Sequence, residues 1–207
     1  MLSQKSNSIK AILVIFTVLF VDQFVKIYIK LHFQLGEQVE VFNWFKIYFI
    51  ENNGMAFGIE FIGKLFLTLF RIFAVGILIF YIRKLIKNEY RTGYIVTISL
   101  LTAGAAGNIF DSLFYGMLFS DSYGHLASFM PNGGGYAPFL YGKVVDMFYF
   151  PIIKNPAEPD KAYFFPWIFN VADSAITVSV AIILLFFRKE LNSSLEKKPA
   201  NDDHIKE

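Results

Sequence analysis

The sequence contains no cysteine among its 207 residues. This absence excludes a disulfide framework, a thiolate nucleophile and a cysteine-ligated metal. Histidine is almost as scarce, and the three histidines, His32, His125 and His204, are far apart in the chain, so we predict no metal site. A strong excess of one charge is also lacking, because the formal net charge is only +2. We therefore predict no nucleic-acid partner.

Apolar residues are what the chain has in excess. Hydrophobic residues make up 55% of the sequence, phenylalanine occurs 25 times, and the mean hydropathy is +0.48. The apolar residues gather in runs long enough to cross a bilayer, which the core of a soluble protein does not require. The runs predict an all-α membrane protein with four transmembrane helices, at about residues 9–31, 65–86, 93–113 and 169–187.

Basic residues beside these runs predict the orientation, because lysine and arginine accumulate in short cytoplasmic loops. Lys5 and Lys10 flank the first run, and Arg83, Lys84, Lys87 and Arg91 lie between the second and third. Both termini are then cytoplasmic, and the connections at about 32–64 and 114–168 lie outside. The first run imitates a signal peptide, but no small-residue cleavage site follows it, so we predict that it is retained.

A single domain is predicted for residues 1–190. The alternating stretch Gln38–Phe42 predicts a short strand, and hence a small extracytoplasmic subdomain that contains β structure. The second outer connection carries the run Asn132–Gly135 and is predicted to form an extended loop. Residues 191–207 are polar and charged, which predicts a disordered cytoplasmic tail.

Polar residues inside the runs are the candidate functional groups, because each is costly in lipid unless it meets a partner or water. Asp22 and Lys26 stand four residues apart, a spacing that allows an ion pair on one helix face. Two other runs each carry an Asn-x-x-Asp edge, Asn108 with Asp111 and Asn170 with Asp173. A structural ion pair and a hydrogen-bond network between packed helices are the alternatives to a functional site.

Asp146 adds a further carboxylate in an apolar stretch of the second outer connection. An isolated aspartate in such a place is commonly a turn residue or a helix cap. The connection from Asp146 to Asp173 contains several prolines and could fold back. If the two carboxyl groups meet, repulsion and partial desolvation raise one pKa, so that the pair shares a proton and can activate water.

At these residues the sequence resembles lipoprotein signal peptidase, also called signal peptidase II, an aspartic peptidase of bacterial inner membranes. Five short elements carry the resemblance, in the order of the family and over nearly the whole chain. They are Asp22-Gln23-x-x-Lys26, Asn52-Asn53-Gly54-Met55-Ala56-Phe57, Gly107-Asn108-x-x-Asp111-Ser112, Val144-Val145-Asp146-Met147 and Phe169-Asn170-Val171-Ala172-Asp173-Ser174.

The resemblance implies that Asp146 and Asp173 form a catalytic dyad at the outer face of the bacterial cytoplasmic membrane. It implies that a further set of residues lines or supports the site, namely Asn52, Gly54, Asn108, Asp111, Asn170, Asp22 and Lys26. The implied substrate is a prolipoprotein whose lipobox cysteine carries diacylglycerol. Membrane lipid is the other expected partner, hydrolysis needs no cofactor, and we expect a monomer.

The chain departs from the family pattern at Ser112, where arginine is usual, and we predict that Arg71 supplies the missing guanidinium. The outer loop from Phe114 to Tyr141 is also longer than the family core requires, and it could be a lid or a partner surface. Two other functions remain as alternatives. One is an inactive homologue that only binds lipoprotein precursors, and the other is a proton-coupled transporter with ionisable residues spread through the bilayer.

Overall fold

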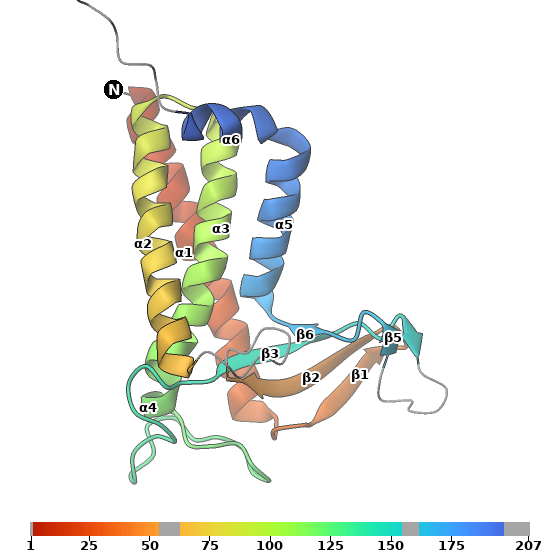
Figure 1. The fold of residues 1–207 in the computed structure, drawn as a ribbon. Coiled ribbons are helices and arrows are strands. Elements are labelled where there is room, and N and C mark those ends of the chain that lie inside the picture. Colours follow the sequence, from red (N-terminus) through yellow and green to blue (C-terminus); the bar gives the residue numbers. More distant parts are fainter. Residues whose placement is uncertain (1, 54–62, 155–161, 197–207) are drawn as a thin grey trace, which may run out of the picture.

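Figure 1 shows a bundle of helices with a small sheet projecting from one end. The computed structural model describes residues 2–53, 63–154 and 162–196. Gly54 and the last eleven residues of the predicted tail lie outside these ranges. Within them the chain combines apolar helices with antiparallel strands, as the sequence predicted.

Among the described residues, three helices are long and apolar enough to cross a membrane. They are α1 (Leu2–His32), α2 (Lys64–Lys87) and the third, α3 (Thr92–Phe110), with its continuation through η1 (Asp111–Tyr115) and α4 (Gly116–Leu118). The fourth predicted span corresponds to α5 (Val171–Phe186), which meets α6 (Arg188–Leu195) at 89° and counts as a span together with it. The predicted membrane fold is therefore confirmed.

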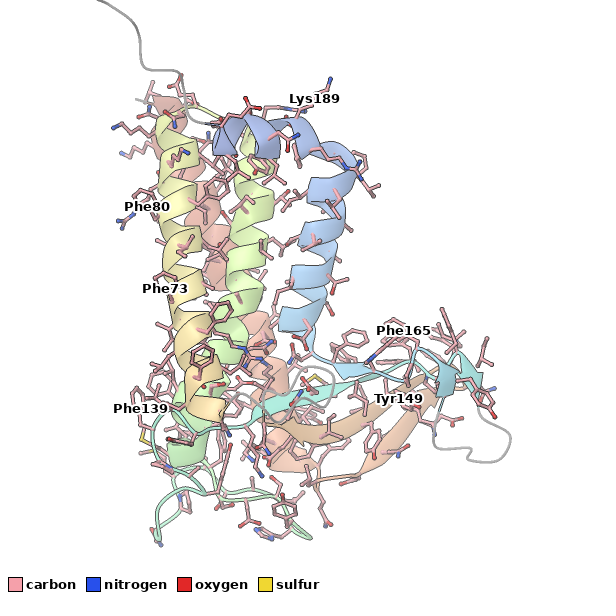
Figure 2. All side chains as sticks on the ribbon, in the orientation of Figure 1. Phe73, Phe80, Phe139, Tyr149, Phe165 and Lys189 are labelled. Carbon is pink, nitrogen blue, oxygen red and sulfur yellow. The ribbon has the colours of Figure 1, made fainter. Side chains whose placement is uncertain are left out.

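The outer surface of the bundle is apolar, as a surface facing lipid requires. Figure 2 shows Phe73 and Phe80 projecting from α2 away from the other helices. Their side chains are 68% and 72% exposed. Exposed apolar groups on this scale would be a liability in water, so the lipid bilayer is the solvent that fits them.

Small residues allow three helices to meet at the point where the site forms. A side chain at Gly107 of α3 would approach Asp22 Oδ2 of α1 to 2.7 Å and the Cβ of Ala172 of α5 to 3.0 Å. A side chain at Gly104, one turn earlier, would approach the backbone oxygen of Ala172 to 2.4 Å and Cγ1 of Ile176 to 2.8 Å. Glycine at both positions therefore lets α1 and α5 pack closely on α3.

A four-stranded antiparallel sheet lies at the end of the bundle opposite the N-terminus (Figure 1). Its strand order is β1–β2–β3–β6, and the strands are β1 (Gln38–Phe42), β2 (Phe45–Asn52), β3 (Val144–Tyr149) and β6 (Ile168–Phe169). A separate pair joins β4 (Ile153–Lys154) to β5 (Ala162–Phe164). The strand predicted at 38–42 is confirmed as β1. In the β2–β3 pair Ile50 lies opposite Asp146 and Asn52 opposite Val144.

The outer loop packs against the bundle and the sheet. Phe119 and Ala127 are buried in one apolar cluster with Phe49 of β2 and Tyr115 of η1. An isolated bridge joins Phe119 to Phe129. The extended loop predicted from sequence therefore has its own core contacts.

The first residues of the predicted disordered tail are helical, which corrects the boundary placed at residue 191. Helix α6 continues to Leu195 and crosses the end of the bundle at which α1 begins (Figure 1). Ser194 is 2% exposed, accepts a hydrogen bond from Lys84 Nζ at its carbonyl (2.7 Å), and its hydroxyl bonds to that of Tyr81. Tertiary contacts of these residues outweigh the polar composition that predicted disorder.

Candidate active site

The beginning of α5 places one carboxyl group of the site. Asn170 caps the helix: its side-chain oxygen accepts from the backbone nitrogen of Asp173 at 2.9 Å, and Asp173 Oδ2 accepts from the Asn170 backbone nitrogen at 3.4 Å. This capping box satisfies two backbone donors of the first turn. It also fixes Asp173 at the positive end of the helix dipole, a position that favours negative charge.

Asp146 reaches the same place from the sheet. It lies on β3 with a 2% exposed side chain, although the sequence alone favoured a turn or a cap for it. Asn170 Nδ2 donates to Asp146 Oδ1 at 2.7 Å, and Asn52 Nδ2 donates to Asp146 Oδ2 at 3.4 Å. Two amides from two different elements therefore hold this carboxyl.

An amide pair links the two aspartates. Asn170 Nδ2 also donates to Asn108 Oδ1 at 3.0 Å, and Asn108 Nδ2 donates to Asp173 Oδ1 at 2.7 Å. The resulting chain runs from Asp146 through Asn170 and Asn108 to Asp173. Both predicted Asn-x-x-Asp edges contribute to this chain. The hydrogen bonds that join the helices are therefore the same ones that position the two aspartates.

Lys26 of α1 is the buried cation behind this chain. Its Nζ lies 2.9 Å from each of three acceptors, Asp22 Oδ2, Asp111 Oδ2 and Asn108 Oδ1. The lysine side chain is fully buried, so each donated bond is worth more than it would be in water. The ion pair predicted from the four-residue spacing of Asp22 and Lys26 is present, and Asp111 joins it from η1.

The two acidic partners of Lys26 connect it to the backbone of the site. Asp22 Oδ1 accepts from the Ala172 backbone nitrogen at 2.8 Å, and Asp111 Oδ2 accepts from that of Val145 at 3.2 Å. Asp111 opens a π-helical turn, a feature that is frequent at functional sites. In the described part of the chain, no buried side-chain polar atom lacks a hydrogen-bond partner.

Burial controls the protonation of Asp146. Loss of solvent, and after it the charge of Asp173, raise the pKa of this carboxyl, to about 7 overall. Lys26 and the amides of Asn170 and Asn52 act in the opposite direction without cancelling the effect. Asp146 can therefore hold a proton near neutral pH while a second carboxyl group stands nearby, which is the electrostatic condition for a shared proton.

These buried groups all gather at the end of the bundle that adjoins the sheet. A relay across the bilayer would need ionisable groups at successive depths. The site instead brings together two carboxyl groups that differ in solvent exposure, since Asp146 is buried and Asp173 is half-buried. Such a pair suits acid–base hydrolysis.

Comparison with known proteins agrees with this chemistry. Residues 14–188 match the family model of signal peptidase (SPase) II. The chain belongs to the signal peptidase II family. A lipoprotein signal peptidase of Porphyromonas gingivalis is 43% identical over 189 residues, covering 87% of this chain and 84% of that protein. One of Staphylococcus aureus is 32% identical over 189 residues, covering 90% and 92%.

Solved structures agree as well. A bacterial membrane enzyme solved by the in meso method is 28% identical, with a TM-score of 0.61 over 92% of this chain and 94% of that one. A second is 30% identical, with a TM-score of 0.60 over 84% and 90%. As a member of the signal peptidase II family, the chain is an aspartic endopeptidase and a multi-pass membrane protein of bacteria, which confirms both predictions.

Most of the site residues predicted for this member of the family come together. Asp146, Asp173, Asn170, Asn108 and Asn52 form one hydrogen-bonded group, with Lys26, Asp22 and Asp111 directly behind it. Gly54 lies outside the described residues.

One site residue was missed although its motif had been recognised. Gln23 Nε2 donates to Asp22 Oδ2 at 3.0 Å and to Asp111 Oδ1 at 2.9 Å, while its oxygen accepts from Tyr115 at 3.0 Å. Gln23 could have been predicted from its place beside Asp22 within an apolar run, because an uncharged amide is also costly in lipid without partners.

Ser112 and Arg71 mark where this member departs from the family pattern. Ser112 is 2% exposed, and its hydroxyl donates to the Asn108 backbone oxygen at 3.0 Å. This hydrogen bond lies within the helix and does not reach either site aspartate. Arg71 of α2 is half-buried, and its charge interacts with Asp173, Asp146 and Asp111, in that order of strength. The guanidinium thus lies within electrostatic range of both site aspartates.

Proposed function

We propose that this endopeptidase removes signal peptides from prolipoproteins, with Asp146 and Asp173 as its catalytic pair. Family membership supports the reaction. One observation carries the choice of residues: the carboxyl groups of a strand and of a helix start are bridged by the Asn170 and Asn108 amides. The residues proposed to line or support the site are Asn52, Gly54, Asn108, Asp111, Asn170, Asp22 and Lys26.

The proposed chemistry needs two carboxyl groups and a water molecule. The ionised carboxylate accepts a proton from the water as its oxygen attacks the scissile carbonyl carbon, and the protonated carboxyl donates to the carbonyl oxygen. When the tetrahedral intermediate collapses, the C–N bond breaks, and the leaving nitrogen takes a proton from the pair. We assign the shared proton to Asp146, because burial and the neighbouring Asp173 raise its pKa to about 7.

The proposed substrate carries diacylglycerol on its lipobox cysteine, and the enzyme works as a monomer surrounded by lipid. The outer faces of the helices support the lipid part of the proposal, since most of the large side chains exposed there are apolar. The carboxyl groups lie where the bundle meets the sheet, so a peptide bond close to a membrane anchor is within their reach.

The direct test incubates the purified protein in detergent with a diacylglyceryl-modified precursor. We expect loss of the signal peptide, followed by mass spectrometry, and little cleavage of the same precursor without its lipid. Intact modified precursor after incubation with folded protein would contradict the proposed function.

The proposed orientation places both termini in the cytoplasm and the catalytic pair at the outer face. The start of α1, the basic α2–α3 turn and α6 share one end of the bundle, and the sheet lies at the other (Figure 1). A reporter fused after Lys87 should therefore behave as cytoplasmic, and one inserted near Gly134 as external. The opposite pattern would place the site on the wrong side for exported precursors.

The pH dependence of cleavage follows from Asp146. A raised pKa means that the folded protein retains this proton up to about pH 7 and loses it above. We expect kcat/KM to fall above about pH 7, approaching tenfold per pH unit, because two ionised carboxylates cannot supply the acid. The measurement is a profile between about pH 5 and 9 with the modified precursor. A flat profile above neutrality would assign the proton to another group.

Arg71 should matter through its charge. Replacement by alanine should lower kcat about 10- to 100-fold, in the range of lost electrostatic stabilisation, and Arg71→Lys should retain more activity than Arg71→Ala. In the Arg71→Ala background, Ser112→Arg should recover part of the loss if the two positions share a role. Strictly additive effects of the two substitutions would show that positions 71 and 112 have independent roles. Full activity of Arg71→Ala would mean that the arginine only extends to the membrane interface and does not act in catalysis.

A further inference from the structure

A second buried charge cluster lies beside the site and takes no part in the proposed chemistry. Lys30 of α1 is fully buried, and its Nζ lies 2.5 Å from Glu51 Oε1 and 3.1 Å from Ser122 Oγ. Lys143, which precedes β3, reaches Glu51 Oε2 at 3.1 Å. The Glu51 side chain is 1% exposed, so one buried carboxylate bridges two lysines.

The outer loop completes this cluster. Tyr136 lies between the two lysines, with Lys30 Nζ 5.0 Å and Lys143 Nζ 5.4 Å from its ring centre, and its hydroxyl accepts from the Lys143 backbone nitrogen at 2.7 Å. Tyr123 offers its ring to Lys143 at 5.0 Å. Aromatic faces stabilise cations most where water is excluded. The loop residues 119–142 therefore hold the cluster through specific contacts.

The cluster is coupled to Asp146 through the sheet. In the β2–β3 pair, Glu51 lies opposite Val145, between the pairs Ile50–Asp146 and Asn52–Val144. The backbone of Val145 is fixed on its other side, since its nitrogen donates to Asp111 (3.2 Å) and its oxygen accepts from Asn170 (3.2 Å). Moving Glu51 would therefore move the strand that carries Asp146.

The same helix supplies the cations on both sides of this strand. Lys30 stands one turn after Lys26 on α1, and Lys26 binds the Asp22–Asp111 group. Two lysines of one helix are thus connected to the β2–β3 pair, Lys30 through Glu51 of β2 and Lys26 through Asp111, which accepts from the Val145 backbone of β3. Burial lowers the pKa of Lys143, but the Glu51 carboxylate and the Tyr123 hydroxyl together outweigh it, so the pKa of this lysine is raised.

We propose that Glu51 is a positioning residue for Asp146: held between Lys30 and Lys143, it fixes β2 and β3 against α1, and the outer loop is part of this frame. The inference rests on the proposed catalytic role of Asp146. It also answers the open choice between a lid and a partner surface, because the loop supplies the Ser122 hydroxyl and the Tyr136 ring to the buried Lys30 cation. Opening the loop would remove these contacts, and a buried charge that loses its polar partners is costly.

Lys143 is the position at which to test this, because its side chain is 19% exposed and its loss leaves the Lys30–Glu51 pair in place. We expect Lys143→Met to lower kcat about 10- to 100-fold, the scale of a small misplacement of a catalytic group. KM should stay within about twofold, because an interaction that only positions the acid does not bind substrate. Lys143→Arg, which retains the ion pair, should stay within about threefold of the parent.

The pH profile separates positioning from a merely structural role. The charged groups acting on Asp146 are Asp173, Lys26 and Arg71, and all of them remain in Lys143→Met. If β3 loosens, water reaches Asp146 and the alkaline limb should shift to lower pH. Lys46→Met is the matched control, since this lysine also belongs to the sheet but its ammonium group donates to Gln38 of β1 (3.5 Å), away from Glu51. We expect it to resemble the parent.

Each outcome decides the inference. Parent-like kcat and pH profile in Lys143→Met, a rise in KM alone, or a lower kcat with an unmoved alkaline limb would overturn it. If Asp146→Asn retained activity, the proposed function would fail whatever Lys143 does. If Asp146→Asn were inactive and Lys143→Met normal, only the positioning role would fail.

Discussion

Replacing Asp146 or Asp173 by asparagine should reduce cleavage by at least about a thousandfold, because an acid–base pair that cannot exchange a proton loses its full contribution. Asparagine keeps the size of the side chain, and at Asp146 it keeps an oxygen that can accept from Asn170 (2.7 Å in the parent). The readout is single-turnover cleavage of the modified precursor. Glu40→Gln, at an exposed position of β1, is a control of the same chemical type.

The variants must be shown to fold. The raised pKa of Asp146 predicts whether Asp146→Asn gains or loses stability. A buried carboxyl whose pKa rises to about 7 is stabilising in its protonated form, and this contribution is lost as pH rises through that value. Asp146→Asn should therefore unfold at a temperature no lower than the parent at pH above about 7. Near-parent turnover by either variant would contradict the proposal that Asp146 and Asp173 form the catalytic pair. Loss of folded protein would instead assign the residue a structural role.

Lys26→Met should be the most destabilising single substitution at the site. It leaves Asp22 and Asp111, both fully buried, without the cation that they share at 2.9 Å. Removing one partner of a buried charge group costs about 3–5 kcal/mol, most of it from the charges left unpaired. We expect little folded protein in the membrane, measured by detergent extraction and thermal unfolding.

A compensating substitution distinguishes charge from packing. In the Lys26→Met background, Asp111→Asn removes one of the unpaired carboxylates while keeping an oxygen that can accept from the Val145 backbone, now 3.2 Å from Asp111. It should restore part of the lost stability without restoring cleavage. A Lys26→Met protein as stable as the parent, or a double variant worse than the single one, would show that the lysine is not held by its charge.

Sequence reasoning predicted those features that depend on neighbours along one helix. Apolar runs predicted the spans, and the spacing of Asp22 and Lys26 predicted their ion pair. Run length decides the first, and a spacing of four residues brings the two charges onto one helix face. Both signals are local, so they can be recognised without knowing the fold.

Features that depend on distant pairing were missed. Strand β3 has no alternation, since nearly all of Val144–Tyr149 is buried, and its identity as a strand comes from β2, almost a hundred residues earlier. Lys30 lies within the first apolar run, and its partners Glu51 and Ser122 are far away in sequence, so nothing nearby indicated a role for it. Helix α6 is polar and gains its order from contacts with α2.

The length of α5 has a consequence for the lipid around the enzyme. With 16 residues at a rise of about 1.5 Å each, the helix extends about 24 Å, whereas the hydrocarbon layer of a typical bilayer is about 30 Å thick. Such a mismatch is relieved by local thinning of the bilayer. We therefore expect the membrane to be thinner beside the helix that carries Asp173, which would shorten the distance that a peptide bond attached to a lipid anchor has to rise to reach that carboxyl group.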